Sequence, residues 1–406
     1  MNNAINNENK KLNVPNLRFP EFQGEWEKCK LSEICTFFSG GTPSSSNKDF
    51  YGGNIAFIRS GELHADSTEL FITQAGFDSS SAKMVEIGDL LLAMYGATSG
   101  DIAASKIKGA INQAILCIRT KQNKKFIESV WNKHVSKNLR KYLQGGQGNL
   151  SADIVKGISF FFPTLKEQEK IANLVSLLDE RIATQNKIID SLQTLIKGIA
   201  DNILDNPLWE KTYLRSFMQF FSTNSLSWEQ LSYEDGKIRN LHYGLIHSFQ
   251  TSGINSASLP MVKYGAIPKQ YTLCQVGDVA FADASEDTNE IGKSVEFVDT
   301  IDVDTICGLH TIHGRDVKNK TLIGFKGFAF NSRYFHNQIK RLAQGTKVFS
   351  ITANNLSSCY VYLPDLETQK AIVNLLKTYE AKLLVSKRLL EHYEKQKQYL
   401  LCQMFI

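Results

Sequence analysis

The sequence predicts an α+β protein with a pseudo-two-fold internal repeat. Two similar mixed α/β domains would be separated by two long helices that form an antiparallel coiled coil. Two observations predict this fold. A tryptophan-containing motif returns 183 residues later in the 406-residue chain, and each half closes with a long heptad pattern that contains no proline.

The repeat follows a polar N-terminus, residues 1–13, which we expect to be flexible. The first set of matches pairs Trp26-Glu27-Lys28, Leu31 and Phe37-Phe38-Ser39 with Trp209-Glu210-Lys211, Leu214 and Phe220-Phe221-Ser222. Further matches pair Ile87-Gly88-Asp89 with Val276-Gly277-Asp278, and Pro163, Leu165 and Gln168 with Pro364, Leu366 and Gln369. The predicted domains are residues 14–163 and 206–363, followed by helices at residues 164–205 and 364–406.

Each long helix has apolar residues at alternating spacings of four and three, which is typical of a coiled-coil seam. The first helix would begin with a capping box formed by Thr164 and Glu167. The predicted seam consists of Ile171, Val175, Leu178, Ile182, Ile189, Leu192 and Ile196 in the first helix, and of Ile372, Leu376, Tyr379, Leu383, Leu390 and Tyr393 in the second. Polar Gln185 and Ser386 occupy corresponding positions, as expected for one shared register.

Positive charge is concentrated in one segment of each half. Residues 119–141 contain eight Lys or Arg against one acid, and residues 315–347 again contain eight against one. The rest of the chain has 30 basic and 39 acidic residues, although the formal net charge is +5. A polyanionic partner would explain this segregation, whereas ordinary solvated helix faces are the alternative for either segment alone.

Composition excludes several classes of protein. No run approaches 18 consecutive apolar residues, so no transmembrane helix is predicted, and the Asn-rich start does not resemble a signal peptide. The seven cysteines are scattered and lack a CxxC pair. We therefore expect reduced thiols, a cytoplasmic location and no metal site.

The chain resembles the specificity subunits of type I restriction-modification systems. The resemblance extends from Val14 to Ile406 and rests on an ordered set of motifs together with their duplication. These motifs are Val14-Pro-Asn-Leu-Arg-Phe-Pro-Glu-Phe-x-Gly-x-Trp26, Ser39-Gly-Gly-Thr-Pro43, Gly88-Asp89-Leu90-Leu91 and Phe162-Pro-Thr-Leu-Lys-Glu-Gln168-x-Lys-Ile171. The second copy departs from the family at Glu367-Thr368-Gln369 and at Ser222-Thr-Asn-Ser-Leu226, which lacks glycine.

This resemblance implies a non-catalytic subunit with two target recognition domains, each contacting one half of a bipartite double-stranded DNA sequence. The helices would act as a spacer and dock two modification (methyltransferase) subunits, with restriction/translocase subunits completing the complex. S-adenosylmethionine, ATP and Mg would belong to those partners, and this chain would carry no cofactor. Adenine N6 methylation or DNA cleavage would be their chemistry, and no membrane partner is implied.

Apparent catalytic motifs have simpler explanations. Pro364-Asp365 followed by Glu380 and Lys382 matches a nuclease pattern, but that chemistry needs the last two residues on one strand and here they fall in the predicted helix. His310 and His313 would point to opposite faces of a predicted strand, so a structural role is favoured over a metal site. We expect no catalytic residues in this chain.

The candidate DNA contacts fall into two groups, since lysine and arginine contact phosphates while polar loop residues contact base edges. The phosphate candidates are Lys124, Lys125, Lys137, Arg140, Lys141, Arg333, Lys340, Arg341 and Lys347. The base or loop candidates are Thr42, Ser44, Asn47, Lys48, Arg59, Gln147, Arg239, Asn240, Tyr243, His247 and Thr346.

Two other functions stay open on the sequence alone. A duplicated coiled-coil scaffold could recognise a protein or another ligand, which the acidic remainder of the chain allows and the paired basic segments disfavour. A methyltransferase fragment would bind S-adenosylmethionine as an isolated chain, which we do not expect.

Overall fold

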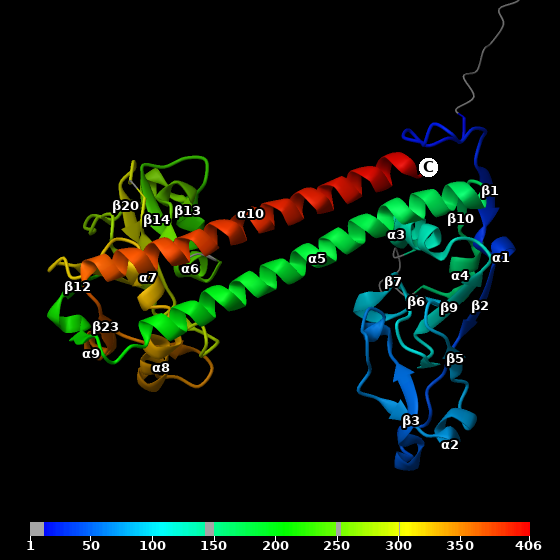
Figure 1. The fold of residues 1–406 in the computed structure, drawn as a ribbon, viewed down its shortest axis with the longest axis horizontal. Helices are drawn as coiled ribbons and strands as arrows, with labels where there is room; N and C mark the ends of the chain where they lie inside the picture. The colour runs from blue at the N-terminus through cyan, green and yellow to red at the C-terminus, as the bar shows by residue number, and fades with distance from the viewer. Residues whose placement is uncertain (1–11, 143–149, 249–252, 300) are drawn as a thin grey trace, which may run out of the picture. The chain divides into compact units, whose positions relative to one another are not determined.

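The computed structural model describes residues 12–142, 150–248, 253–299 and 301–406. The chain forms two compact units (Figure 1). The first unit comprises Met1–Gln185 with Leu389–Ile406, and the second comprises Asn186–Arg388. Each unit therefore contains one globular domain and part of each long helix. None of the described helices is long and apolar enough to cross a membrane.

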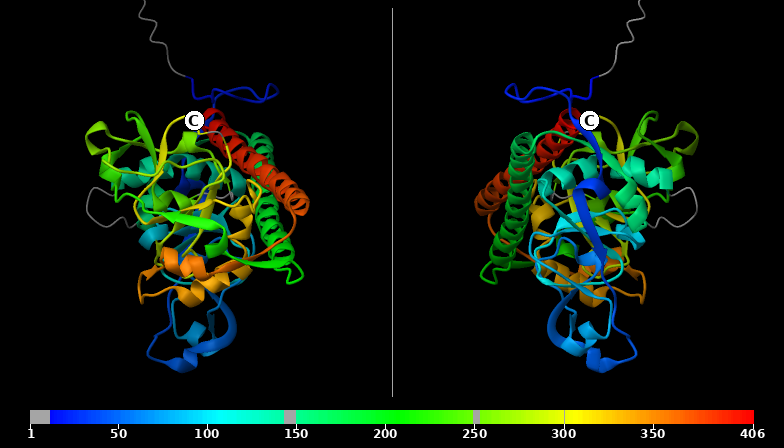
Figure 2. Two further views of the ribbon diagram at one scale, coloured as in Figure 1. Left: turned by 90° about the vertical axis from the view of Figure 1, so that its left-hand side faces the viewer. Right: turned by 90° about the vertical axis from the view of Figure 1, so that its right-hand side faces the viewer.

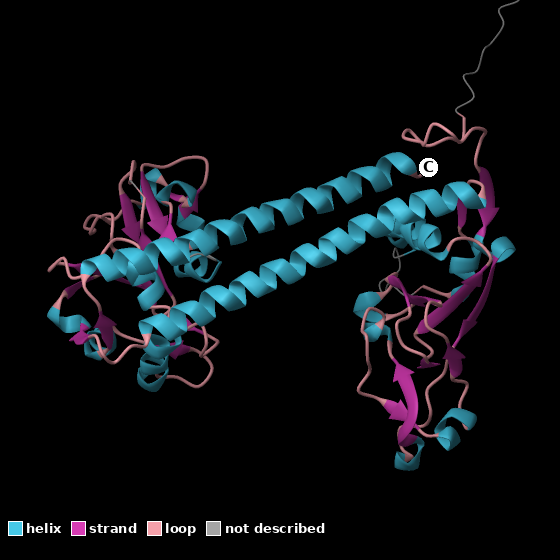
Figure 3. Ribbon diagram, viewed as in Figure 1, coloured by secondary structure: helices cyan, strands magenta, loops and turns pink. Residues whose placement is uncertain are grey.

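The first unit contains three small sheets, drawn in magenta in Figure 3. Their strand orders are β1-β10, β2-β9-β6-β7 and β4-β3-β8-β5. The strands are β1 (Glu27–Lys30), β2 (Cys35–Ser39), β3 (Tyr51–Ile58), β4 (Phe71–Ile72), β5 (Lys83–Val85), β6 (Leu90–Ala93), β7 (Ile102–Ala104), β8 (Gly109–Ile111), β9 (Ile115–Thr120) and β10 (Ser159–Phe162). The helices are α1 (Leu31–Ile34), α2 (Gln74–Asp78), α3 (Lys124–Tyr142), α4 (Ala152–Gly157), the start of α5 (Leu165–Leu204) and the end of α10 (Leu366–Met404).

The second unit repeats the central strand pairing of the first unit and has several additional strands. Its principal sheets have the orders β12-β21-β17-β19-β15 and β13-β16-β14-β20, and the pairs β11-β23 and β18-β22 complete it. The strands are β11 (Glu210–Tyr213), β12 (Met218–Phe221), β13 (Leu231–Ser232), β14 (Ile238–Leu241), β15 (Gly253–Ile254), β16 (Met261–Val262), β17 (Val279–Ala282), β18 (Ala284–Ser285), β19 (Ser294–Phe297), β20 (Thr305–Cys307), β21 (Thr311–Asp316), β22 (Phe349–Ser350) and β23 (Tyr360–Leu363). The helices are α6 (Tyr243–Ser248), α7 (Phe325–Ala329), α8 (Arg333–Leu342), α9 (Ala353–Ser358) and the start of α10 (Leu366–Met404).

Strand register confirms that the two halves are copies of one fold. Glu27 pairs with Phe162 in the first unit, and Glu210 pairs with Leu363 in the second. The parallel pair β3-β8 likewise corresponds to the parallel pair β14-β20. The repeat predicted from sequence is therefore a repeat of structure.

The predicted seam faces inward along both long helices. All thirteen of its residues are buried or partly buried. In the first unit, Ile171 and Val175 of α5 share a core with Met404 of α10. In the second unit, Leu204 of α5 shares a core with Ile372 of α10. The start of each helix thus meets the end of the other, so the pairing is antiparallel, and both views in Figure 2 show α5 beside α10.

The start of α5 differs from the predicted capping box. The Glu167 backbone N–H donates to Thr164 Oγ1 at 3.4 Å, but the Glu167 carboxylate turns away from the cap. It accepts two hydrogen bonds of 2.8 Å from Arg18 and one of 3.3 Å from the Trp26 indole. Burial of this carboxylate favours partners with N–H donors over a solvated cap.

The second copy uses a different cap. Asp365 accepts hydrogen bonds from the backbone N–H and the hydroxyl of Thr368, both at 2.9 Å. These bonds lower the pKa of Asp365, as expected for a carboxylate at a helix N-terminus. The departure from the family at Thr368 therefore has a structural role, and Asp365 is a helix cap rather than part of a nuclease site.

We expect Leu376→Ala to destabilise the second unit by about 2–5 kcal/mol, since Leu376 is fully buried and truncation leaves a cavity. Leu384→Ala on the same helix is the matched control, because Leu384 is 46% exposed and should change stability by less than about 0.5 kcal/mol. Denaturant unfolding of the full chain measures both variants. Equal effects would contradict the assigned seam.

Candidate nucleic-acid interface

The repeated Gly-Asp motif anchors an arginine in the first unit. Arg119 donates to Asp89 Oδ2 from Nε at 3.0 Å and from Nη2 at 2.6 Å. Its guanidinium also lies 4.9 Å from the centre of the Phe38 ring. Burial alone would raise the pKa of Asp89, but the hydrogen bonds from Arg119 outweigh it and lower the pKa. Asp89 is thus held as a carboxylate, paired with an arginine that also packs on an aromatic ring.

The second unit contains the same arrangement. Arg315 donates to Asp278 from Nε at 2.8 Å and from Nη2 at 2.7 Å, and lies 5.0 Å from the Phe221 ring. Asp278 also contacts Nε2 of His313 at 2.7 Å. These contacts explain the repeated Phe-Phe-Ser and Gly-Asp motifs, and they neutralise one arginine of each basic segment.

The repeated glutamine fixes each long helix to its domain. Nε2 of Gln168 donates to the carbonyl of Pro163 at 2.9 Å, and its Oε1 accepts from the backbone N–H of Asn123 at 3.2 Å. Gln369 repeats both bonds, with the carbonyl of Pro364 at 3.0 Å and the N–H of Leu322 at 2.8 Å. Both glutamines are buried. The motif Pro-x-Leu-x-x-Gln is therefore a helix–domain junction.

Two phosphate candidates of the first unit have structural partners. Lys124 donates to the carbonyl of Gly88 at 2.6 Å and lies 3.6 Å from Asp89. Lys125 pairs with Asp179 of α5 at 2.8 Å and also with Glu128. Burial opposes the charge of Lys125, but these carboxylates outweigh it and raise its pKa. We therefore correct the interpretation of Lys125 to a tie between α3 and α5.

The remaining candidates of this segment cannot be placed in the same way. Lys137, Arg140 and Lys141 lie in α3, but their side chains fall outside the described part of the molecule, and Gln147 falls outside the described residues. Lys133, which was counted in the basic segment, donates to the carbonyl of Phe405.

In the second unit, exposed cations gather on and after α8. Ser332 caps this helix by accepting from the N–H of Phe335. The exposed candidates here are Arg333, Lys340, Arg341, Thr346 and Lys347. Lys326 of the same basic segment is instead buried in an ion pair with Glu296 at 3.0 Å.

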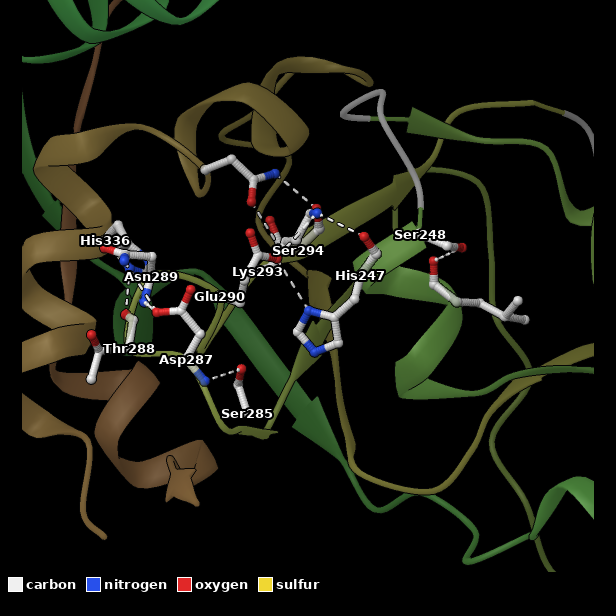
Figure 4. A network of polar contacts seen from close by, with 12 residues as sticks. His247, Ser248, Ser285, Asp287, Thr288, Asn289, Glu290, Lys293, Ser294 and His336 are labelled. Atoms are coloured by element: carbon white, nitrogen blue, oxygen red, sulfur yellow. Dashed lines mark hydrogen bonds and ion pairs between the residues drawn. The ribbon is translucent and has the colours of Figure 1, made fainter. Parts of the chain in front are cut away.

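A cavity of about 900 Å³ in the second unit brings together His247, Arg333 and Lys340 from the predicted set. Figure 4 shows part of its polar network. His247 Nδ1 and Lys293 Nζ both lie 3.2 Å from Glu290, and Lys340 donates to the Asn289 amide at 2.6 Å. The lining cations are Lys197, Lys293, Arg333 and Lys340, and the lining carboxylates are Asp201, Glu290 and Glu380. This near balance does not make the cavity strongly cationic.

The loop candidates of the first unit lie on exposed turns or partly exposed caps. Thr42 donates to Gln113, and Asn47 caps the short 3-10 turn Lys48–Phe50 by accepting from the N–H of Asp49. Ser44 and Lys48 are exposed. Arg59 pairs with Glu62 at 2.9 Å while its side chain stays 51% exposed.

The second-unit candidates divide by burial. Asn240 is fully buried and its amide has no hydrogen-bond partner, so its prediction as a base contact is wrong for this structure. Arg239 and Tyr243 are partly exposed. Tyr243 lies in an aromatic cluster with His242, whose ring centre is 4.7 Å away, and His310, at 5.3 Å.

Sequence reasoning did not predict Trp228, His242 or His310 of this aromatic cluster as candidate contacts. Trp228 is 46% exposed, and its ring centre lies 4.5 Å from that of His242 with the two planes tilted by 35°. Burial lowers the pKa of His242, and the nearby His310 lowers it further. Trp228 lies close to His242 because strands from distant segments of the chain pair. In the sequence, only the aromatic composition of these segments could have indicated that the two residues form a cluster.

Comparison with known proteins identifies the chain. The family described as Type I restriction modification DNA specificity domain matches residues 23–194 and 259–394. The chain belongs to this family. It is a specificity subunit of a type I restriction-modification system, and the DNA target recognition expected from the resemblance is confirmed at the level of the family.

Individual relatives agree with this assignment. The specificity subunit of type I restriction enzyme MjaVIII from Methanocaldococcus jannaschii is 22% identical over 405 residues, covering 94% of this chain and 92% of the relative. The EcoR124I/EcoR124II specificity subunit from Escherichia coli is 28% identical over 187 residues, covering 43% of this chain and 45% of the relative.

Solved structures share the fold of this specificity subunit. The type I S subunit from M. genitalium superimposes with a TM-score of 0.59 at 14% identity, covering 97% of this chain and 99% of the other. A chain from a study of the assembly and conformational transition of the type I R-M system gives 0.57 at 15% identity, covering 93% and 96%.

We expect Asp89→Asn to destabilise the first unit by about 1–3 kcal/mol at neutral pH, because it removes a charged acceptor from Arg119. The pKa of Asp89 is lower in the folded protein, so its stabilisation is present above the unfolded pKa of about 3.9 and is lost as pH falls through the folded value. The difference between the wild-type chain and the variant should therefore shrink in acid.

Unfolding measured from pH 7 down to pH 3 tests this prediction. Asp153→Asn is the matched control, since that side chain is 91% exposed beside Lys156 and should change stability little at any pH. A constant difference between wild type and Asp89→Asn across this range would contradict the prediction.

Proposed function

We propose that this specificity subunit binds a bipartite double-stranded DNA target, with one half-site contacted by each globular domain. The observation that carries the proposal is the structural repeat, in which both domains keep the same Asp-Arg anchor and the same glutamine junction to a long helix. Two copies of one fold on one chain suit two half-sites of one target.

The second domain offers the better-defined candidates for DNA contacts. Arg341 and Lys347 are exposed on or after α8 and are candidates for phosphates, which supply the salt-dependent part of affinity. Tyr243 at the start of α6, His310 before β21 and Trp228 before β13 present aromatic and polar edges. Such groups suit contacts to bases in a groove. In the first domain the corresponding candidates are Lys48 and Arg59.

We further propose that the long helices dock two modification subunits. The seam residues of the two helices are buried or partly buried against each other and the domains, but large apolar side chains elsewhere on both helices are exposed. They are Leu165, Leu177, Leu389 and Tyr399 in the first unit, and Ile188, Leu195, Leu366, Leu375, Leu384 and Val385 in the second. Exposed apolar groups of this kind are typical of surfaces that bind a protein partner.

The chemistry belongs, in this proposal, to the partners. The modification subunits would supply S-adenosylmethionine for adenine N6 methylation, and restriction/translocase subunits would use ATP and Mg. This subunit would act in the cytoplasm, where it meets DNA. Its own contribution is to choose the sequence and to position the modification subunits on it.

We expect DNA binding by the assembled complex to weaken steeply with salt, with a log–log slope of about −5 or steeper if six or more phosphates are contacted. Arg341→Ala/Lys347→Ala should make the slope shallower by about 1 for each phosphate that the variant no longer neutralises. Lys382→Ala removes an exposed charge from α10 and is the control. A slope near zero would contradict the phosphate assignment.

Exchange of residues 207–363 for those of a relative should change one half of the methylated target only. Methylome sequencing of cells that carry the modification subunit would show a split adenine-methylated motif that disappears without this gene. A change in both halves after the exchange would contradict the assignment of one half-site to each domain.

A further inference from the structure

Three side chains that can ligate a metal meet inside the second unit. Cys274, Cys307 and His313 are all buried, and their ligating atoms lie within 4.8 Å of one another. The two sulfur atoms are 3.6 Å apart. Cys307 ends β20 and His313 lies in β21, so the cluster joins the two principal sheets of this unit.

The first unit shows that the fold does not require such side chains here. His313 pairs across β21 and β12 with Phe221, and Cys117 pairs with Phe38 at the corresponding point of β9 and β2. Cys117 is therefore the register equivalent of His313.

The other two positions are equivalent by the same logic. Cys274 precedes Asp278 by four residues, as Val85 precedes Asp89. Cys307 is the last residue of β20, and Ile111 is the last residue of β8. β20 runs parallel to β14 in the second unit, as β8 runs parallel to β3 in the first.

In the first unit, Val85, Ile111 and Cys117 belong to one buried hydrophobic cluster. The same place in the fold thus holds two aliphatic side chains and one thiol in the first copy, and two thiols and an imidazole in the second. His313 is paired with Asp278 through Nε2, and the two thiols contact each other at 3.6 Å. The second copy therefore brings three metal-ligating side chains together at a place where the first copy has one.

We propose that Cys274, Cys307 and His313 bind a zinc ion. Thiolates and imidazole are the preferred ligands of zinc, and two sulfurs bound at about 2.3 Å to a tetrahedral zinc are separated by roughly 3.8 Å. The observed sulfur separation of 3.6 Å fits this geometry. A disulfide would instead need a sulfur–sulfur distance of about 2.05 Å.

Asp278 acts as a positioning residue for this site. Its carboxylate holds Nε2 of His313 at 2.7 Å and is itself fixed by Arg315. A carboxylate that orients a ligating histidine in this way is a common feature of zinc sites, because it sets the ring orientation and leaves the other ring nitrogen for the metal.

The ion would brace the turn between β20 and β21. That turn carries His310, whose ring lies 5.3 Å from Tyr243 in the aromatic cluster. Zinc would therefore stabilise the second domain next to its candidate base contacts. The expectation of no metal site rested on cysteine spacing along the chain, whereas this proposal rests on the spatial proximity of the three side chains.

The test is zinc content of the full-length protein. The chain is purified under reducing conditions with zinc supplied, dialysed against metal-free buffer and analysed by mass spectrometry of the elements. We expect about one zinc per chain. Cys274→Val/Cys307→Ile introduces the first unit's residues at these positions and should abolish zinc binding. Cys359→Ala, which removes another buried thiol of the same unit, should leave it unchanged.

A second measurement covers the case in which the double variant does not fold. Thermal unfolding of wild type and of Cys359→Ala is followed with and without a chelator, and both should melt at lower temperature when zinc is removed. The proposal is overturned if wild type with reduced thiols holds no zinc, if the double variant holds as much as wild type, or if chelation leaves the melting temperature unchanged.

Discussion

The attachment of each long helix to the domain that precedes it is the constraint on which both halves depend. In each half the attachment is made by the side-chain amide of one buried glutamine, Gln168 in the first half and Gln369 in the second. Each side-chain amide binds the carbonyl of the proline before its long helix. It also accepts from a backbone N–H of the domain, that of Asn123 before α3 or that of Leu322 before α7. Because an unpaired buried amide is costly, the direction of each helix is tied to the fold of its domain.

The duplicated charge has two different uses. Arg119 and Arg315 serve the fold, since each is neutralised by an aspartate and packed on a phenylalanine. Lys125 and Lys326 are likewise committed to internal carboxylates. A basic segment in the sequence therefore overstates the charge available to a polyanion. Among the residues that the structure describes, the remaining charge includes exposed positions such as Arg341.

How much the sequence could predict depended on the range of the interaction. The helices and their seam followed from local periodicity, so residues such as Ile171 and Leu376 were identified directly. The repeat also marked Asp89 and Gln168 as important, but not their partners. Strand pairing brings Arg119 to Asp89, and the packing of α5 on its domain brings Gln168 to Asn123. Within the candidate interface, the burial of Asn240 and the proximity of Trp228 to His242 depend on the same long-range pairing, which no spacing rule encodes.

The helix pairing also has a consequence for the order in which the protein can be completed. Met404 and Phe405 lie in the core of the first unit, where the Phe405 ring is 5.0 Å from that of Phe126. A ribosome makes these residues only after the entire second unit. The apolar surface that Met404 and Phe405 cover in the first unit therefore stays exposed while the second unit is synthesised. A chain that ends before these residues would have a complete second unit and an incomplete core in the first unit.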